Sequence, residues 1–259
     1  MTIEQATSIL GQFATWFTLI IVFLTLREME KQRKASQKPE LIITNISLHG
    51  YYKDDDDMHI ISQWSNIQIN DNKTDIIKGP KIFIYNIGAG AAKEIKIKWD
   101  FDIQGTIKHI QDYSYHNSIP IIVSTHNNFL HIETKDRKVV INVKLESNPE
   151  YAYLMPASIT SQGLEVHLPW TFMELLSILV FIGKHQLDKK SNDGSVVQLE
   201  DSFFEFPTLH CGLSYLDIGG EKYSKKFDVT VTMFAIRTFE KEFNSTKPAF
   251  NGMVEFKER

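Results

Sequence analysis

The sequence predicts a mainly β chain, with an N-terminal transmembrane helix followed by an antiparallel β-sandwich-like domain that carries one or two inserted helices. Three observations lead to this prediction: an apolar block at Ile9–Leu26, a series of short β-branched segments after Pro39, and a second apolar segment at Pro169–Gly183. The composition, with 42% hydrophobic and 23% charged residues in 259, is that of a globular chain.

The N-terminal block contains no charged residue. At about 1.5 Å per residue it covers roughly 27 Å, close to the thickness of a bilayer hydrocarbon core. The basic leader and the small-residue cleavage pattern of a signal peptide are missing. We therefore expect a membrane anchor over residues 9–26. The anchor residues expected to contact lipid are Ile9, Trp16, Phe17, Ile20, Ile21, Phe23 and Leu26.

Basic residues follow this block, whereas none precedes it. The positive-inside rule then places residues 1–8 outside a bacterial inner membrane and the rest of the chain in the cytoplasm. Residues 27–38 are expected to continue as a basic juxtamembrane helix, with Glu30 and Lys34 at i,i+4 spacing, until Pro39 ends it. The residues expected at lipid head groups are Arg27, Lys31, Arg33 and Lys34.

The chain after Pro39 has the pattern of an antiparallel β domain. Several short strands with turn signals between them favour a sandwich or barrel over β-α-β units. Gly219 and Gly220 are suited to a tight hairpin turn. We expect the β domain over residues 39–243 and a C-terminal tail over 244–259. The expected strands are 40–48, 81–86, 93–103, 119–125, 128–134, 139–145, 164–168, 209–217 and 223–236.

The segment Pro169–Gly183 is expected to form a helix, because Thr171 and Glu174 have capping-box spacing and Gly183 is a suitable stop. It is too short to span a bilayer comfortably. It could fill the core, dock on a partner or second copy, or lie on a membrane surface, and we favour the core. It is also the best interface candidate, through Trp170, Phe172, Leu175, Leu176 and Leu179.

Motifs that would indicate chemistry are weak. Asn86–Ala92 matches the first two glycines of a dinucleotide fingerprint, but Lys93 replaces the third and a period-two strand pattern follows. We therefore expect these glycines to shape a link between strands. Asp54–Asp57 is expected to be a solvated loop, since calcium loops need spaced ligands. No metal-binding signature occurs among the nine histidines, and no cofactor or metal is expected.

The charge of the chain limits its expected partners, and its cysteine content limits the expected cellular compartment. The net charge of −4 comes without a basic stripe, so nucleic acid is not an expected partner. Cys211 is the single cysteine, which excludes an intrachain disulfide and suits a reducing compartment. It alternates with Leu209 and Leu213, a pattern typical of a buried strand position.

A resemblance follows from the apolar span, the basic neck and two motifs. The motifs are N-x-G-x-G-x-A at Asn86–Ala92 and L-x-Y-x-D-x-x-G-x-x-Y at Leu213–Tyr223. The chain resembles uncharacterised bacterial single-pass membrane-anchored proteins with a β-sandwich-like cytoplasmic domain. The resemblance implies an architecture and no catalytic residues. Some proteins that look like this belong to phage-defence or mobile-element loci.

Three functions are therefore open. The first is a membrane-anchored, non-enzymatic binding or sensor module, whose partners are membrane lipid and either another protein or further copies of the chain. The second is a membrane-disrupting effector, as in phage defence, that oligomerises through its span on sensing a trigger. The third is a membrane-tethered hydrolase or nuclease, for which Asp100, Asp102, His109 and Asp112 would have to meet in one cleft.

Overall fold

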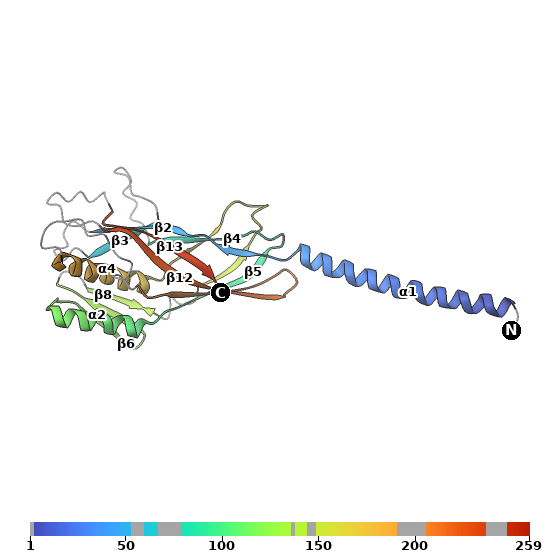
Figure 1. Ribbon diagram of the computed structural model, residues 1–259, viewed down its shortest axis with the longest axis horizontal. Coiled ribbons are helices and arrows are strands. Elements are labelled where there is room, and N and C mark those ends of the chain that lie inside the picture. Colours follow the sequence, from blue (N-terminus) through green and yellow to red (C-terminus); the bar gives the residue numbers. More distant parts are fainter. Residues whose placement is uncertain are drawn as a thin grey trace.

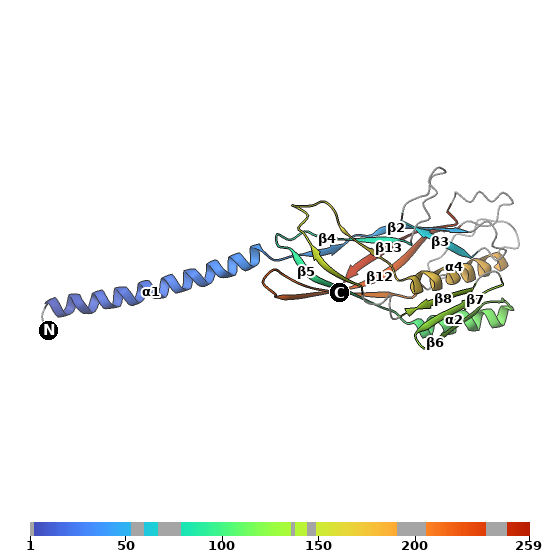
Figure 2. The same ribbon diagram turned by 180° about the vertical axis from the view of Figure 1, so that it is seen from behind.

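A long helix projects from one end of a β-rich domain (Figures 1 and 2). This helix, α1 (Ile3–Ser36), ends three residues before Pro39, as expected for a residue that disfavours helix ahead of it. The computed structural model describes residues 3–52, 60–66, 79–135, 138–143, 149–190, 206–236 and 248–259, and their side chains except those of 3–13 and 187–190.

The prediction of a mainly β chain built from antiparallel strands is confirmed. The largest sheet has seven strands, in the order β3-β2-β13-β12-β11-β5-β9, and every pairing is antiparallel. Its strands are β3 (Ile61–Ser65), β2 (Ile46–Tyr52), β13 (Phe250–Glu258), β12 (Lys222–Ile236), β11 (Leu209–Leu216), β5 (Ala92–Asp100) and β9 (Glu150–Leu154).

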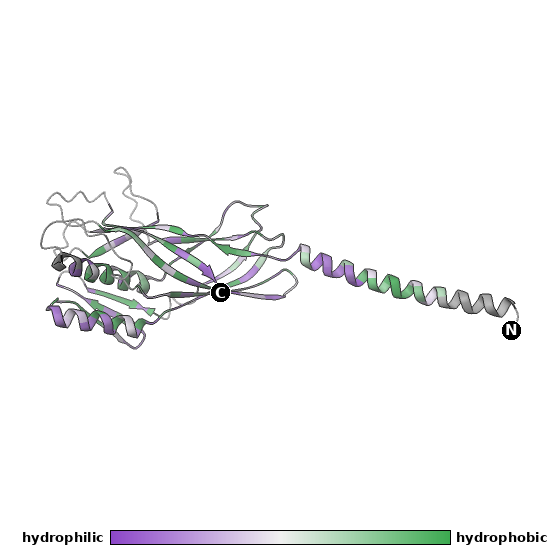
Figure 3. Ribbon diagram, in the orientation of Figure 1, coloured by the Kyte–Doolittle hydropathy of each residue, from purple (hydrophilic) through white to green (hydrophobic). Residues whose placement is uncertain are grey.

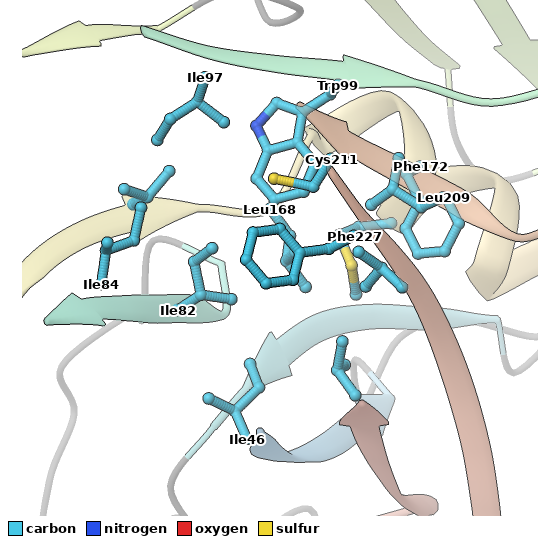
Figure 4. Packing of buried hydrophobic residues seen from close by; sticks show 14 of the residues in the cluster. Ile46, Ile82, Ile84, Ile97, Trp99, Leu168, Phe172, Leu209, Cys211 and Phe227 are labelled. Carbon is cyan, nitrogen blue, oxygen red and sulfur yellow. The ribbon is translucent and has the colours of Figure 1, made fainter. Parts of the chain in front are cut away.

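A second sheet contributes to the same hydrophobic cluster. Ile82 and Ile84 from this sheet pack with Ile97 and Trp99 of β5, and all four are at most 5% exposed (Figure 4). The alternation of buried and half-buried residues along β4 accounts for this contact, because successive side chains of a strand point to opposite faces. The strands of this second sheet are β1 (Leu41–Ile43), β4 (Lys81–Asn86) and β10 (Leu164–His167).

A third sheet and two helices enclose a separate hydrophobic cluster. Ile110 of the first helix and Leu130 of the sheet are fully buried in it. The helices are α2 (Ile103–Asn117) and α4 (Trp170–Lys190), and the strands, in sheet order, are β6 (Ile122–His126), β7 (Phe129–Glu133) and β8 (Lys138–Asn142).

Helix α4 lies between the two clusters, which accounts for its lack of a polar face. Phe172, Met173, Leu176 and Val180 belong to the cluster of the large sheet. Leu175, Ile178, Leu179 and Ile182 belong to the cluster of the third sheet. The two sets repeat at helical spacing on different faces. A helix that is apolar all round is a buried helix, and α4 fits that rule.

The favoured interpretation of Pro169–Gly183 as a core helix therefore agrees with the structure, and the interface candidates are corrected. Phe172, Leu175, Leu176 and Leu179 are at most 6% exposed within one chain, so they have no surface to offer a partner. Trp170 is half-buried and packs against the second cluster.

Four strand assignments differ from the expectation. The expected strand 40–48 divides into β1 and β2, which belong to different sheets. Strands β3 and β9 come from segments without a clear strand pattern. The expected tail 244–259 contains β13, which pairs with both β2 and β12 and so lies inside the large sheet. The acidic run Asp54–Asp57 lies outside the described residues.

The expectation of a transmembrane helix at an inner membrane is wrong. Across the part of the chain whose side chains are described, no helix combines the length and the apolar character needed to cross a bilayer. In α1 that part starts at Ala14, and charged residues begin at Arg27. Ile9 lies outside the described side chains.

Candidate functional site

The middle of α1, from Ala14 to Leu26, is apolar (Figure 3), and its side chains are exposed. Trp16 is 68% exposed and Phe23 is 65% exposed. The hydroxyl groups of Thr18 and Thr25 form hydrogen bonds within the helix. Each donates to the backbone carbonyl oxygen four residues earlier, over 2.8 Å. The residues expected to anchor the chain are therefore exposed on a projecting helix: Trp16, Phe17, Ile20, Ile21, Phe23 and Leu26.

The end of α1 nearer the domain, from Arg27 to Ser36, is charged and forms ion pairs within the helix. The Nζ atom of Lys31 lies 3.6 Å from Glu28, and that of Lys34 lies 2.8 Å from Glu30. Such exposed pairs add only a few tenths of a kcal/mol each. The four residues expected at lipid head groups, Arg27, Lys31, Arg33 and Lys34, all lie exposed on this segment.

A four-residue segment, Gln37–Glu40, joins α1 to the domain and fits closely against the glycine loop that links β4 and β5. A Cβ atom at Gly88 would overlap the backbone of Lys38 and Glu40, and one at Gly90 would overlap the carbonyl group of Gln37. The loop also donates a hydrogen bond to this segment: the Ile87 N–H binds the Glu40 carbonyl oxygen over 2.8 Å. These glycines are needed because two backbones approach each other here.

Asn86 connects this segment to the domain with both ends of its side-chain amide. Its Oδ1 accepts the N–H groups of Glu40 and Gly88, each at 3.1 Å. Its Nδ2 donates to the carbonyls of Gly90 at 2.7 Å and Leu154 at 3.3 Å. The residue is only 1% exposed, so these bonds satisfy a polar group that is out of contact with water.

The hairpin between β11 and β12 contacts the joining segment as well. The Lys38 ammonium group lies 5.3 Å from the centre of the Tyr223 ring, within cation–π range. Asp217 shapes the turn by accepting the Glu221 N–H over 2.8 Å, and Gly220 has the positive φ that the turn requires. Burial, with help from the carboxylates of Glu221 and Asp217, raises the pKa of Tyr223 to about 12.

A three-residue ionic cluster completes the junction. The Lys225 Nζ atom on β12 lies 2.5 Å from Glu40 and 3.2 Å from Glu258 on β13. Its side chain is 13% exposed. Burial lowers the pKa of Lys225, but hydrogen bonds to the two carboxylates outweigh that effect, so the pKa is raised overall.

The two motifs singled out in the sequence thus meet at one place. Asn86–Ala92 and the end of Leu213–Tyr223 both contact the Gln37–Glu40 segment. Sequence reasoning identified both motifs and missed this shared role. The available signal was a glycine pair without a following helix, which excludes a phosphate loop and suggests close backbone packing.

The residues required for a hydrolase or nuclease do not come together. Asp102 and His109 line one cavity, Asp100 lines another, and Asp112 lies outside both. Asp102 also caps α2 by accepting the Gly105 N–H over 2.8 Å. Among the described residues, no three histidine, cysteine or acidic side chains are close enough to hold a metal ion.

Cys211 is a core residue, as its alternating pattern predicts. It is 1% exposed within the large cluster, beside Trp99 (Figure 4). Burial raises the pKa of its thiol to about 12, so the thiolate that a nucleophile requires does not form at neutral pH.

Comparison with known proteins does not assign the chain to a family. No family model, curated protein or solved structure matches it. The geometry of α1 and its junction therefore has to support any functional proposal by itself.

Proposed function

We propose that the chain is a non-enzymatic assembly module, in which copies associate through α1 and carry sandwich-like β domains as binding modules. One observation supports this most strongly: the apolar side chains of Ala14–Leu26 are exposed on a helix that the domain holds at its base. Exposed apolar surfaces of this extent on soluble chains mark interaction sites.

The energetics favour association over isolation. Burying a large aliphatic or aromatic side chain gains about 1.5–3 kcal/mol, and nine such side chains are exposed between Trp16 and Leu26. Burying most of them would offset the roughly 4–15 kcal/mol of rotational and translational freedom lost on binding. A second copy supplies the matching surface, because each copy presents the same uncharged segment. The charged residues Glu28, Glu30, Lys31 and Lys34 are already paired within their own helix and do not oppose this contact.

The number of copies follows from the distribution of the apolar residues. Successive helical residues are rotated by 100°, so the six apolar residues Leu19–Leu24 surround the whole helix. A two-helix pair would cover a single face of each helix. Three or more helices give each one at least two neighbours. We therefore propose an assembly of at least three copies.

Light scattering after size-exclusion chromatography of the full chain, in buffer without detergent, tests the proposal. We expect a mass of at least three times 29.9 kDa. Phe23→Lys should reduce the mass, because it places a charge within the contact. Tyr115→Lys, at an 86% exposed position on α2, should leave it unchanged.

Three results would contradict the proposed assembly. A wild-type mass of one or two chains contradicts the proposal, as does an equal effect of the two substitutions. Binding of the chain to phosphatidylglycerol vesicles without self-association also overturns it, since lipid would then be the occupant of the apolar surface.

A further inference from the structure

A cavity of about 430 Å³ lies where the start of α2, the middle of α4 and the residues leading into β11 meet. It is independent of α1 and of the assembly proposal. Its volume falls within the range of small-molecule sites in proteins. The residues around it are Asp102, Gly105, Thr106, His109, Leu179, Pro207, Thr208 and His210.

His210 is held in place by the neighbouring strand. Its Nδ1 atom lies 2.9 Å from Oδ1 of Asp228, its register partner on β12, and 2.9 Å from a guanidinium nitrogen of Arg259. The hydrogen bond from Arg259 lowers the pKa of Asp228 below its ordinary value. Burial raises this pKa, and the hydrogen bond with His210 lowers it further, so the pKa is lowered overall. Because Nδ1 is engaged on the sheet side, Nε2 is the ring nitrogen left for a ligand.

Asp102 is the charged group of the cavity. Its Oδ1 accepts the Gly105 N–H at 2.8 Å as the cap of α2, which leaves Oδ2 for a ligand. The lining residues include no lysine or arginine, and Asp102 is the carboxylate among them. A carboxylate without a basic side chain beside it in the lining favours a cationic ligand. A metal ion is not suited to it, since the described residues hold no set of three ligands.

We propose that this cavity binds a small organic ammonium compound bearing a hydroxyl group. Asp102 acts as the counter-ion, and the carboxylate accepts hydrogen bonds from the ammonium group. Nε2 of His210 and the hydroxyl of Thr208 form hydrogen bonds with the ligand's hydroxyl group. Pro207 provides an apolar contact for its carbon atoms.

Saturation-transfer difference NMR on the full chain tests this with three probes of similar size, each at 5 mM or about that level. Ethanolamine carries an ammonium and a hydroxyl group, glycolate a carboxylate and a hydroxyl group, and ethylene glycol two hydroxyl groups. We expect a transfer signal from ethanolamine, a weaker one from ethylene glycol and none from glycolate.

Two substitutions on α2 localise the effect. Asp102→Asn keeps a good helix cap but removes the charge, so the ethanolamine signal should fall at least fivefold or thereabouts. Asp112→Asn removes an exposed carboxylate outside the cavity and should change nothing. An unchanged thermal midpoint confirms that Asp102→Asn is folded. The proposal is overturned if no probe binds, if glycolate matches ethanolamine, or if Asp102→Asn binds as wild type does.

Discussion

The side-chain oxygen of Asn86 accepts the backbone N–H of Glu40 at 3.1 Å, and this bond ties the end of the projecting segment to the loop between β4 and β5. Asn86 makes three further hydrogen bonds through the same amide group. Asn86 is therefore one of the contacts that hold the segment joining α1 to the domain, together with the Ile87 N–H, Lys225 and the Tyr223 ring.

Replacing Asn86 by alanine should lower the free energy of unfolding by about 3 kcal/mol or more, since each buried group left without a partner costs about 1–3 kcal/mol. Urea denaturation followed by tryptophan fluorescence measures the loss. Asn66→Ala is the matched control, because within the described residues Asn66 makes a single hydrogen bond, of 3.3 Å, to the Lys81 carbonyl, and its loss should cost about 1 kcal/mol. Equal losses for the two variants would contradict the role given to Asn86.

Gly90→Ala should loosen the junction while the sheets remain intact. The added Cβ would overlap the Gln37 carbonyl, which forces the joining segment away from its loop. Limited digestion with a glutamate-specific protease should then cleave after Glu40, between α1 and the domain, much faster than in wild type. Gly212→Ala, whose Cβ would be 3.7 Å or more from its neighbours, should digest at the wild-type rate. Unchanged cleavage in Gly90→Ala would argue against close packing there.

The Lys225–Glu40 pair should show a larger coupling energy than an exposed pair. A double-mutant cycle with Lys225→Met and Glu40→Gln should give about 1 kcal/mol, against at most about 0.5 kcal/mol for the exposed pair Lys138–Glu133. Because the pKa of Lys225 is raised in the folded state, its contribution is complete below 10.5 and is lost as the pH rises further. A coupling that persists well above that pH would contradict the assignment.

Tyr223 should ionise at a pH of about 12, because its pKa is raised mainly by burial. The folded state favours the neutral phenol, so the stability that Tyr223 contributes declines as the pH rises from about 10 through 12. The difference between wild type and Tyr223→Phe in absorbance at 295 nm isolates this group. A midpoint near the ordinary value of 10 would show that the hairpin does not shield the ring.

The strands of the large sheet could be predicted where their pattern was local. The alternation in Lys93–Trp99 and Leu209–Tyr215 follows directly from one buried face per strand, and β5 and β11 lie where it indicates. Strand β13 was missed because its pairing partners, β2 and β12, come from distant parts of the chain. Long-range pairing supplies a context that a single short segment does not encode.

Parts of the candidate site could likewise be predicted from the sequence, and other parts could not. The apolar character of α1 and the unusual glycine pair are visible in the sequence. That Gly88 and Gly90 face Gln37–Glu40 depends on the tertiary path of the chain, so the sequence predicted only a link between strands. For α4, composition favoured burial, and the structure adds that its two faces belong to different cores.

Cysteine cross-linking tests most directly whether α1 of one copy lies beside α1 of another. The native Cys211 is buried with a pKa of about 12, so an introduced cysteine is the reactive one. Leu19, Ile20, Ile21 and Val22 point in four different directions, and each is replaced by cysteine in turn. Lys138→Cys, at an exposed position on β8, is the control. We predict that at least one position on α1 forms disulfide-linked dimers much faster than the control under mild oxidation. If all four cross-link no faster than Lys138→Cys, the account of α1 as an assembly helix is contradicted.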